Sequence, residues 1–209
     1  MEKLDLSRKY KSYFKAATQP ELVDIEPARF ISITGQGDPD GPAYAACLEA
    51  LYSVAYAIKF RFKNEGADFV VSKLEGLWWY DEERYKDVTM AGTPGSVPRS
   101  EWLYRMMIRM PEFVTEAAVQ EGIRVARAKK PAARVGDVGF FTLHEGTCVQ
   151  MLHVGPFDKE PESLALMLEM IAAKGLRRNG LHHEIYLSDF RKTSPDKCRT
   201  ILREPVLAP

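Results

Sequence analysis

The stretch HHEIYLSDF, residues 182–190, alternates polar and apolar side chains as a β-strand does. Successive side chains of a strand point to opposite faces of its sheet. If Ile185 and Leu187 pack into the core under a helix, Glu184 points the other way, into a cleft. Tyr186 then shares the face of Glu184. The alternative is an exposed edge strand in which Glu184 is an ordinary solvated charge.

A second stretch, LEGLWWYD at residues 74–81, is the counterpart of this strand in the first half of the chain. When the two stretches are aligned at their closing aspartates, Trp78 and Tyr80 fall on the cleft face. Trp79 then belongs to the core side, unless a bulge at Gly76 shifts the alternation. Adjacent tryptophans cannot both be core on a one-sided sheet, so we expect at least one of them to contact a ligand.

The first half of the chain predicts two strands, a helix and two further strands. Residues 21–34 are typical of a hairpin joined at a Glu-Pro turn. Asp40 can cap a helix that runs to about Lys63, and strands follow within residues 67–81 and 101–111.

The second half repeats this order. Residues 138–154 predict a hairpin around the turn HEGT, a helix follows that ends at Gly175, and the last strands lie around 183–189 and 197–205. We therefore predict an α+β fold, a tandem pseudo-twofold repeat of strand-helix-strand-strand modules. Its antiparallel sheets should form a central ligand cleft.

This duplication also predicts the domain organisation. Residues 1–209 should form a single domain of two repeats, about 21–112 and 138–206, joined by a helical connector at 113–137. The polar loop 81–100 is an insertion in the first repeat.

The composition argues against several classes of protein. The 29 basic and 29 acidic residues give no net charge, so no overall field draws the chain to nucleic acid or an anionic membrane. No apolar stretch approaches the roughly 18 residues of a membrane span, and the first residues do not resemble a signal peptide, so we expect a cytoplasmic protein. The three cysteines are an odd number and lie far apart, so they should be reduced thiols.

Further candidate ligand contacts lie on the strand within residues 101–111. Trp102 and Tyr104 could extend an aromatic wall, with Met106 as an adaptable floor. Plain core packing is the alternative for all three. Glu75, next to the wall, is a secondary candidate, with a solvated charge as its alternative.

No motif indicates a metal, cofactor or nucleophile site. His182 and Glu184 could share a ligand set, but no zinc spacing is present, so we expect neither a metal nor a cofactor. The stretch GQGDPDG lacks the Lys-Ser/Thr ending of a phosphate loop, and no Gly-x-Ser-x-Gly elbow occurs.

Five stretches together resemble the GyrI-like small-molecule-binding family, in particular its stand-alone members. The resemblance spans most of the chain, from near Val23 to Val206. The stretches are EALYSVAYAIKF (49–60), LEGLWW (74–79), HVGPFDKEP (153–161), HHEIYLSDFRKTSPDK (182–197) and TILREPV (200–206).

The resemblance implies the repeated strand-helix-strand-strand fold inferred above. Relatives serve as effector-binding portions of multidrug-responsive transcription regulators, and bind bulky aromatic, often cationic compounds beside a glutamate that matches Glu184. Stand-alone relatives hydrolyse cyclopropane-bearing, DNA-alkylating natural products, which gives toxin resistance, whereas others are gyrase-inhibitor-like and act through a protein partner. The expected partner is an aromatic small molecule, and we expect no direct binding to nucleic acid or membrane. The sequence does not decide between a monomer and a homodimer.

The two possible functions, hydrolysis of the ligand and binding without catalysis, use the same residues. For hydrolysis, Glu184 would accept a proton from water, and Tyr186 or Tyr104 would donate to the ligand's carbonyl oxygen. Trp78, with Trp79 as a second partner, would stack on the flat ligand. In a protein that only binds or sequesters drugs, the carboxylate would pair with a cation beside the aromatic faces. We find no DNA-binding segment in the sequence, which favours catalysis or sequestration.

Overall fold

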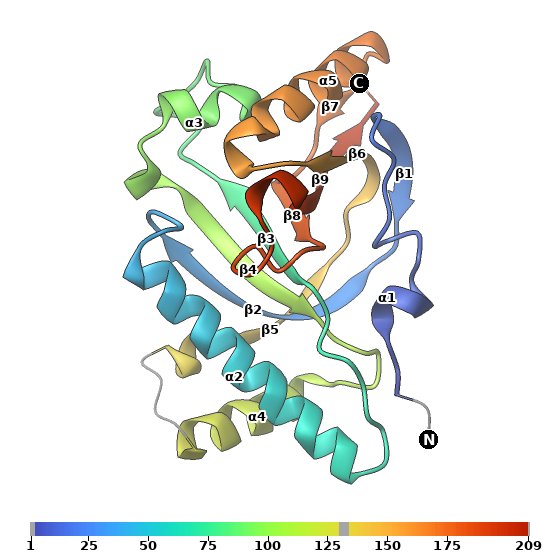
Figure 1. Cartoon of the computed structure of the whole chain (residues 1–209), viewed down its shortest axis with the longest axis vertical. Helices are drawn as coiled ribbons and strands as arrows, with labels where there is room; N and C mark the ends of the chain where they lie inside the picture. The colour runs from blue at the N-terminus through green and yellow to red at the C-terminus, as the bar shows by residue number, and fades with distance from the viewer. Residues whose placement is uncertain (1–2, 130–133, 209) are drawn as a thin grey trace.

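The computed structural model describes residues 3–129 and 134–208 of the chain (Figure 1). Within these ranges the fold is mixed α/β, with five α-helices and a large antiparallel sheet of nine strands. The α-helices are α1 (Leu6–Lys9), α2 (Pro42–Asn64), α3 (Thr93–Ser96), α4 (Glu116–Lys129) and α5 (Glu160–Ala173). The strands are β1 (Glu21–Ile25), β2 (Ala28–Gln36), β3 (Leu74–Trp79), β4 (Leu103–Arg109), β5 (Gly139–Leu143), β6 (Gly146–Val154), β7 (Arg177–Arg178), β8 (His182–Tyr186) and β9 (Arg199–Leu207).

Short 3-10 helices occupy several of the connections. They are η1 (Met90–Gly92), η2 (Arg99–Glu101), η3 (Val135–Asp137), η4 (Phe157–Lys159) and η5 (Pro195–Lys197). The connector expected at 113–137 contains α4, and its residues 130–133 lie outside the described residues. In the described ranges, no helix is both long and apolar enough to cross a membrane.

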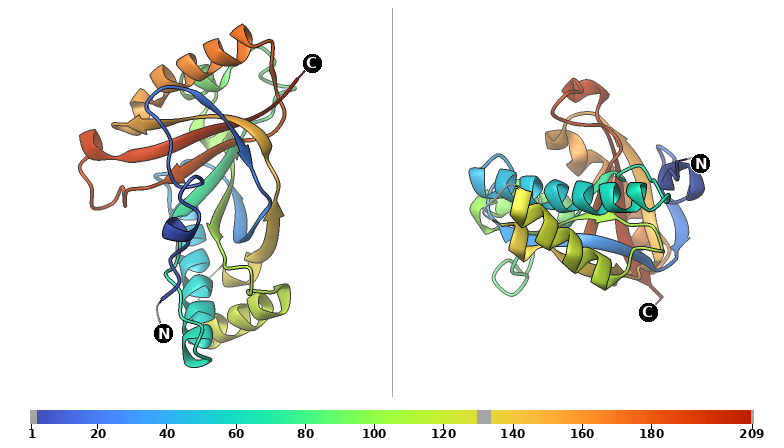
Figure 2. Two further views of the ribbon diagram at one scale, coloured as in Figure 1. Left: turned by 90° about the vertical axis from the view of Figure 1, so that its right-hand side faces the viewer. Right: turned by 90° about the horizontal axis from the view of Figure 1, so that it is seen from below.

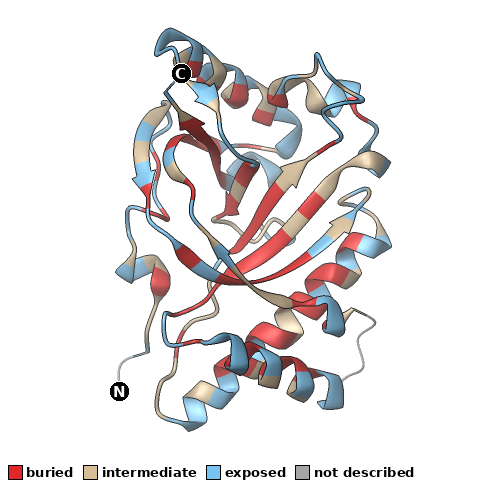
Figure 3. Cartoon of the chain, turned by 180° about the vertical axis from the view of Figure 1, so that it is seen from behind, coloured by how far each residue is buried: buried red, intermediate tan, exposed pale blue. Residues whose placement is uncertain are grey.

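The sheet is continuous across the two halves of the chain. Its strands follow the order β1-β6-β9-β8-β3-β4-β2-β5, and β7 pairs with β9. At the centre β3 pairs with β8, with Gly76 opposite Glu184. Seen from behind, the central strands are buried along much of their length (Figure 3).

Both predicted hairpins are wrong. β1 pairs with β6 of the second half, and β2 pairs with β5. The links between β1 and β2 (residues 26–27) and between β5 and β6 (residues 144–145) have two residues each. A two-residue hairpin needs positive φ at its turn positions, but among the described residues only glycines have positive φ, and neither link contains one. Each half therefore gives its first strand to the other half.

Helices α2 and α5 lie on the same face of the sheet, which is also the face of Glu184 (Figures 1 and 2). Met106 of β4 packs with α2 in one buried cluster, and Leu202 of β9 packs with α5 in another. Met106 is paired with Gly76, and Leu202 is paired with Glu184. Paired residues of neighbouring strands share a face, so both helices cover the side of Glu184.

The opposite face of the sheet is covered by the N-terminal arm, residues 3–20. Ile185 lies in a buried cluster with Leu6, Tyr13 and Phe14 of this arm. Neither of the long helices α2 and α5 covers Ile185, because the arm, with the one-turn helix α1 and the rings of Tyr13 and Phe14, buries this face instead. The alternation itself holds, since Glu184 and Ile185 lie on opposite faces.

The ends of the long helices differ in how well the sequence predicted them. Helix α2 has Pro42 in its first turn, but its N-cap residue is Gly41, which makes no side-chain hydrogen bond. Asp40 does not cap the helix and instead pairs with Arg99, with 2.9 Å between its Oδ2 and an Nη of the guanidinium. Gly175 follows α5 with φ of 63°, in the left-handed conformation expected of a helix terminator.

Candidate functional site

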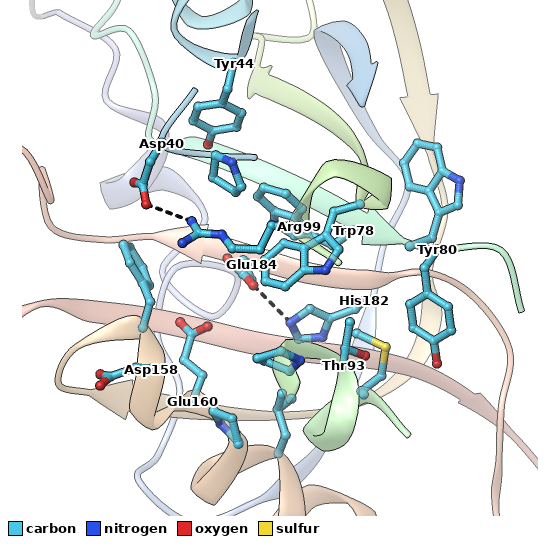
Figure 4. A pocket seen from close by; sticks show the side chains of 18 of the residues that line it. Asp40, Tyr44, Trp78, Tyr80, Thr93, Arg99, Asp158, Glu160, His182 and Glu184 are labelled. Atoms are coloured by element: carbon cyan, nitrogen blue, oxygen red, sulfur yellow. Dashed lines mark ion pairs between the residues drawn. The ribbon is translucent and has the colours of Figure 1, made fainter. Parts of the chain in front are cut away.

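A pocket of about 370 Å³ lies over the centre of the sheet, on the face that carries the helices (Figure 4). Its floor comes from β3 and β8. Its walls come from the first turns of α2 and α5 and from the segment between β3 and β4, residues 80–102, which contains η1, α3 and η2. The pocket thus gathers residues from both halves of the chain.

Gly76 makes room for the floor of the pocket. A Cβ atom at Gly76 would lie 2.9 Å from Nε1 of Trp78 and 3.2 Å from the methyl carbon of Met106, too close for the indole to stay in place. Nε1 of Trp78 donates a hydrogen bond of 3.0 Å to the hydroxyl of Tyr186 on β8. The missing side chain on β3 therefore lets the indole reach the strand that carries Glu184.

Glu184 is held by two neighbours on its own strand. The hydroxyl of Tyr186 donates a hydrogen bond of 2.6 Å to Oε2 of Glu184, and Nε2 of His182 lies 3.3 Å from Oε1. Burial, followed by the charge of Glu184, holds the pKa of Tyr186 well above its ordinary value. The Tyr186 phenol therefore keeps its proton, and that proton is directed at Glu184.

His182 is a buried cation at the base of the pocket. Its Nδ1 lies 2.6 Å from Oε1 of Glu204, whose other oxygen accepts a hydrogen bond of 3.0 Å from Nε of Arg178. Burial by itself lowers the pKa of His182, but the carboxylates of Glu204 and Glu184 outweigh it and raise the pKa to about 10. At neutral pH a positive charge thus lies directly beside Glu184.

Glu160 is a second carboxyl group in the pocket, and sequence reasoning missed it. It is the first residue of α5, it is 8% exposed, and its Oε1 has no hydrogen-bond partner within the described residues. Burial, followed by the charge of Glu184, raises the pKa of Glu160 well above its usual range, while His182 opposes the shift. An acidic residue in the first turn of a helix is common, so nothing in the sequence distinguished it.

Aromatic rings form the walls of the pocket. Of the residues considered from the sequence, Trp78, Trp79, Tyr80 and Trp102 line it. The ring of Trp78 stacks on Tyr44 of α2, with centroids 6.0 Å apart, and meets the edge of Trp102 at 6.2 Å. Trp79 also packs against the apolar cluster on the opposite face, so it borders the pocket from the core side.

Two further aromatic residues of the lining were missed from the sequence. Phe157 of η4 and Phe190, just after β8, contact each other and Tyr186, with ring centroids 5.7 to 6.0 Å apart. Phe157 is 42% exposed, which places it at the mouth of the pocket. Neither residue lies in a strand or long helix, so no alternation pattern could have found them.

The segment 80–102 closes one side of the pocket. Hydrogen bonds within the segment order both of its ends, because the hydroxyl of Tyr80 donates to the carbonyl of Val88 at 2.6 Å and Nε1 of Trp102 donates to the carbonyl of Val97 at 3.0 Å. Arg99 in this segment pairs with Asp38 and with Asp40, both at 2.9 Å. The insertion seen in the sequence is therefore a wall of the pocket.

Tyr104 and Met106 do not line the pocket. Both are fully buried, and they lie in the core cluster beneath Trp78. The hydroxyl of Tyr104 is 3.6 Å from Sγ of Cys47, and its ring centroid is 5.5 Å from that of Trp78. Core packing, the alternative stated for these residues, describes their position, and they support the pocket from behind.

Glu75 is neither a pocket residue nor a solvated charge, so both interpretations of it were wrong. It is fully buried on the opposite face, because its neighbour Gly76 faces the pocket. Its Oε2 accepts a hydrogen bond from Tyr13 of the N-terminal arm and lies 3.0 Å from Nε2 of His183. The other ring nitrogen of His183 lies 3.0 Å from Glu145, which pairs with Arg203 at 3.2 Å.

The pocket therefore combines a carboxylate, a buried cation, a second carboxyl group and flat aromatic faces. No group of three or more His, Cys, Asp and Glu side chains in the described part of the chain could hold a metal ion. This arrangement can bind a flat aromatic molecule and exchange protons with it.

Comparison with known proteins supplies a family and several structural relatives. A family model described as the GyrI-like small molecule binding domain matches residues 18–205. We find no match among curated proteins.

Two solved structures from Listeria innocua are similar to this one. One is described as an uncharacterized conserved protein and the other as a hydrolase. Each is 37% identical to this chain, with TM-scores of 0.87 and 0.84, and each comparison covers 98% of this chain and 100% of the relative. The C-terminal domain of EcmrR is 13% identical with a TM-score of 0.55, over 91% of this chain and 98% of that domain, which is a likeness of fold alone.

Proposed function

The chain belongs to the GyrI-like small molecule binding domain family, and from this premise we propose that it binds bulky aromatic molecules in the pocket and hydrolyses strained cyclopropane rings of DNA-alkylating compounds. The Listeria innocua relative described as a hydrolase supports the catalytic part. Such a reaction would inactivate an alkylating compound before it reaches DNA, and would so give resistance to the toxin.

The observation that carries this proposal is the carboxylate of Glu184 at the floor of an aromatic pocket, between Tyr186 and His182. A cyclopropane fused to a conjugated dienone is strained, so the protein needs only to hold the ligand, position water and accept its proton. Trp78 and Trp102 offer faces for stacking. Glu184 accepts the proton of water as it attacks the ring carbon.

Tyr186 acts in this proposal as a positioning residue. Its only hydroxyl hydrogen is donated to Glu184 at 2.6 Å, and the hydroxyl oxygen accepts from Trp78. Tyr186 therefore fixes the orientation of the carboxylate, and it is not free to donate to the ligand's carbonyl oxygen.

We also propose that the pocket is the ligand cleft of one domain built from two related repeats, about 21–112 and 138–206. In support, each half contains two strands, a helix and two strands in the same order, apart from the two-residue β7. The strand order is also symmetric about the β8–β3 pair, with β9, β6, β1 on one side and β4, β2, β5 on the other.

A second candidate function is binding or sequestration without catalysis. It is favoured by the acidic side chains that border the aromatic faces, since Asp158 lines the pocket together with Glu184. A flat organic cation would pair with the carboxylates and gain cation–π attraction from the rings.

The Glu184→Gln variant tests the proposal. The amide keeps the shape of the side chain but cannot accept a proton, so turnover should fall by about 10²- to 10⁴-fold, while ligand affinity changes by only a few fold. The measurement is incubation with a spiro-cyclopropane dienone alkylator, followed by mass spectrometry for the gain of one water. Glu162→Gln, an exposed residue of α5, is the matched control.

The outcomes separate the two candidate functions. Unchanged turnover in Glu184→Gln would eliminate Glu184 as the base. Tight binding of the alkylator by the unmodified protein, with no gain of water, would leave only the binding function.

A further inference from the structure

We propose that Glu160 is a second catalytic residue, a neutral carboxylic acid that donates a proton to the ligand's carbonyl oxygen while Glu184 accepts the proton of water. This inference rests on the proposed hydrolase function and assigns a proton donor to the same pocket. A separate proton donor is needed because the hydrogen of Tyr186 is already donated to Glu184, and Tyr104 lies outside the pocket lining.

The geometry of Glu160 fits a donor that waits for a ligand. Its side chain enters the pocket from the start of α5 and points toward Glu184 (Figure 4). More than nine-tenths of the residue is buried, yet within the part of the chain described here Oε1 has no partner. A buried polar atom without a partner is costly, and a ligand oxygen in the pocket would satisfy it.

The charges around Glu160 decide which carboxyl group keeps a proton. The groups that face it are Glu184 and His182 of β8, and Asp158 lies at the pocket mouth. Glu184 already accepts the hydrogen bond of Tyr186 and pairs with His182, whereas Oε1 of Glu160 has no partner among the described residues. Two carboxylates in one buried pocket repel each other, so the second one keeps its proton.

Other charges near Glu160 are too exposed or too weak to reverse this. Lys159, its neighbour in the chain, is exposed and pairs with Glu162 at 3.2 Å. Arg99, at the far wall, pairs with Asp38 and Asp40. The N-terminus of α5 favours an anion only weakly, whereas burial and the charge of Glu184 act together in the opposite direction.

The chemical step balances without a further reactant. The oxygen of water forms a bond to the cyclopropane CH2, and the ring C–C bond breaks. Its electron pair moves into the dienone, which becomes a phenol as the carbonyl oxygen takes the proton of Glu160. The proton of water goes to Glu184. After product release, the proton passes from Glu184 to Glu160, directly or through solvent, and the pocket returns to its first state.

This assignment predicts a specific pH profile. Because the donor must be protonated, turnover should fall as pH rises through the pKa of Glu160, and Glu160→Gln should lose that alkaline decline. Its turnover should also be lower by about 10²- to 10⁴-fold. A merely structural role for Glu160 would not remove one limb of the profile.

The experiment compares the unmodified protein with Glu160→Gln and the control Glu162→Gln. Infrared spectroscopy at neutral pH should show the C=O stretching band of a buried protonated carboxyl group in the unmodified protein and in the control, but not in Glu160→Gln. Turnover of a spiro-cyclopropane dienone is followed by mass spectrometry across pH, and binding of its ring-opened phenol by tryptophan fluorescence. Binding of the phenol should change by only a few fold.

Each result has a distinct meaning. An active protein without the protonated carboxyl band, or equal turnover in Glu160→Gln, overturns the role of Glu160 and leaves Glu184 as the base. An unmodified protein that never adds water overturns the hydrolase proposal and this inference together. If Glu160→Gln does not fold, Glu160→Asp replaces it; a shortened acid should keep the alkaline limb with reduced turnover, and a profile without that limb contradicts the proposal.

Discussion

Gly76 and Glu184 face each other across the central strand pair, and the pocket floor depends on the difference in size between them. A side chain at position 76 would collide with the indole of Trp78. Trp78 then could not donate to Tyr186, whose hydroxyl orients the carboxylate of Glu184. One small residue on β3 therefore sets the geometry of a carboxylate on β8.

Substitution of Trp78 tests the stacking surface. Trp78→Ala should weaken the binding of a flat aromatic ligand by roughly 1–3 kcal/mol, or about 5- to 150-fold in Kd, if stacking resembles that seen with nucleobases. Trp78→Phe keeps a flat ring but loses the N–H donor to Tyr186, so it should bind nearly as well and turn over more slowly. Fluorescence titration measures the Kd of each variant, and mass spectrometry measures turnover. An unaltered Kd in the alanine variant places Trp78 outside the site.

For single residues, the sequence predicted which face of the sheet a side chain occupies when the residue lies on a regular strand. Alternation was enough to place Glu184, Tyr186 and Trp78 on one face. It could not identify Glu160, because its role depends on a strand more than 20 positions later in the chain that brings Glu184 opposite it. It also could not place Glu75, since only the packing of the N-terminal arm explains a buried carboxylate there.

The segment 80–102 shows what a connection contributes at the scale of elements. It has little regular structure, yet η1, α3 and η2 supply Met90, Thr93 and Arg99 to the pocket. The ion pairs of Arg99 with Asp38 and Asp40 join this segment to the loop before α2. These two loops come from separate parts of the chain and meet at the edge of the pocket.

Arg99→Gln tests whether this contact retains a ligand. The side chains of Arg99 and Asp38 are each 45% exposed, so the change should lower the free energy of unfolding by less than about 1 kcal/mol. Ligand dissociation should become faster by up to about fivefold, because the loops separate more readily. Stopped-flow dissociation and thermal unfolding measure the two effects. Arg84→Gln, whose partner is Glu101 in the same segment, is the control, and equal dissociation rates in the two variants contradict the idea.

The elements themselves were largely predictable, whereas their pairing was not. Periodicity located the long helices near Pro42–Asn64 and Glu160–Ala173 and the strands around them. Adjacent strands were expected to pair because most short links form hairpins. The links at 26–27 (Glu-Pro) and 144–145 (His-Glu) contain neither the glycine nor the asparagine that two-residue hairpins favour, so the sequence itself argues against both hairpins.

At the scale of the whole molecule, two adjacent histidines tie the layers together. His182 lies between carboxylates on the pocket face, and His183 lies between Glu75 and Glu145 on the face covered by the N-terminal arm. A strand sends neighbours to opposite faces. One dipeptide therefore places an imidazole ring between carboxylates in each of two buried layers.

These buried pairs predict how stability depends on pH. The pKa of His182 is raised from 6.5 to about 10, so its contribution is complete below about pH 6.5 and is lost as pH rises toward 10. Burial would raise the pKa of Glu145, but His183 and Arg203 lower it from 4.5 to about 2, so its contribution is lost as pH falls from 4.5 to 2. Because the pKa of Glu160 is raised above 4.5, its contribution is lost as pH rises from 4.5 through its folded-state pKa.

The free energy of unfolding should therefore be greatest near pH 4.5 and decline as pH rises from there toward 10. Urea unfolding at a series of pH values measures it. His182→Asn should flatten the alkaline decline, whereas His144→Asn, at an exposed position, should not. A curve for the unmodified protein that stays level from pH 6.5 to 10 contradicts the ionisation assigned to His182.

The exchange of first strands has a consequence for motion. β1 pairs with a strand of the second half, and β5 pairs with a strand of the first. The two halves are therefore joined by hydrogen bonds near both outer edges of the sheet as well as at the central β3–β8 pair. A motion that separates the two halves would have to break the hydrogen bonds of all three strand pairs at once. Ligands must therefore enter through the mouth of the pocket and not by separation of the halves. A chain cleaved between its halves should also stay associated through these strand pairs.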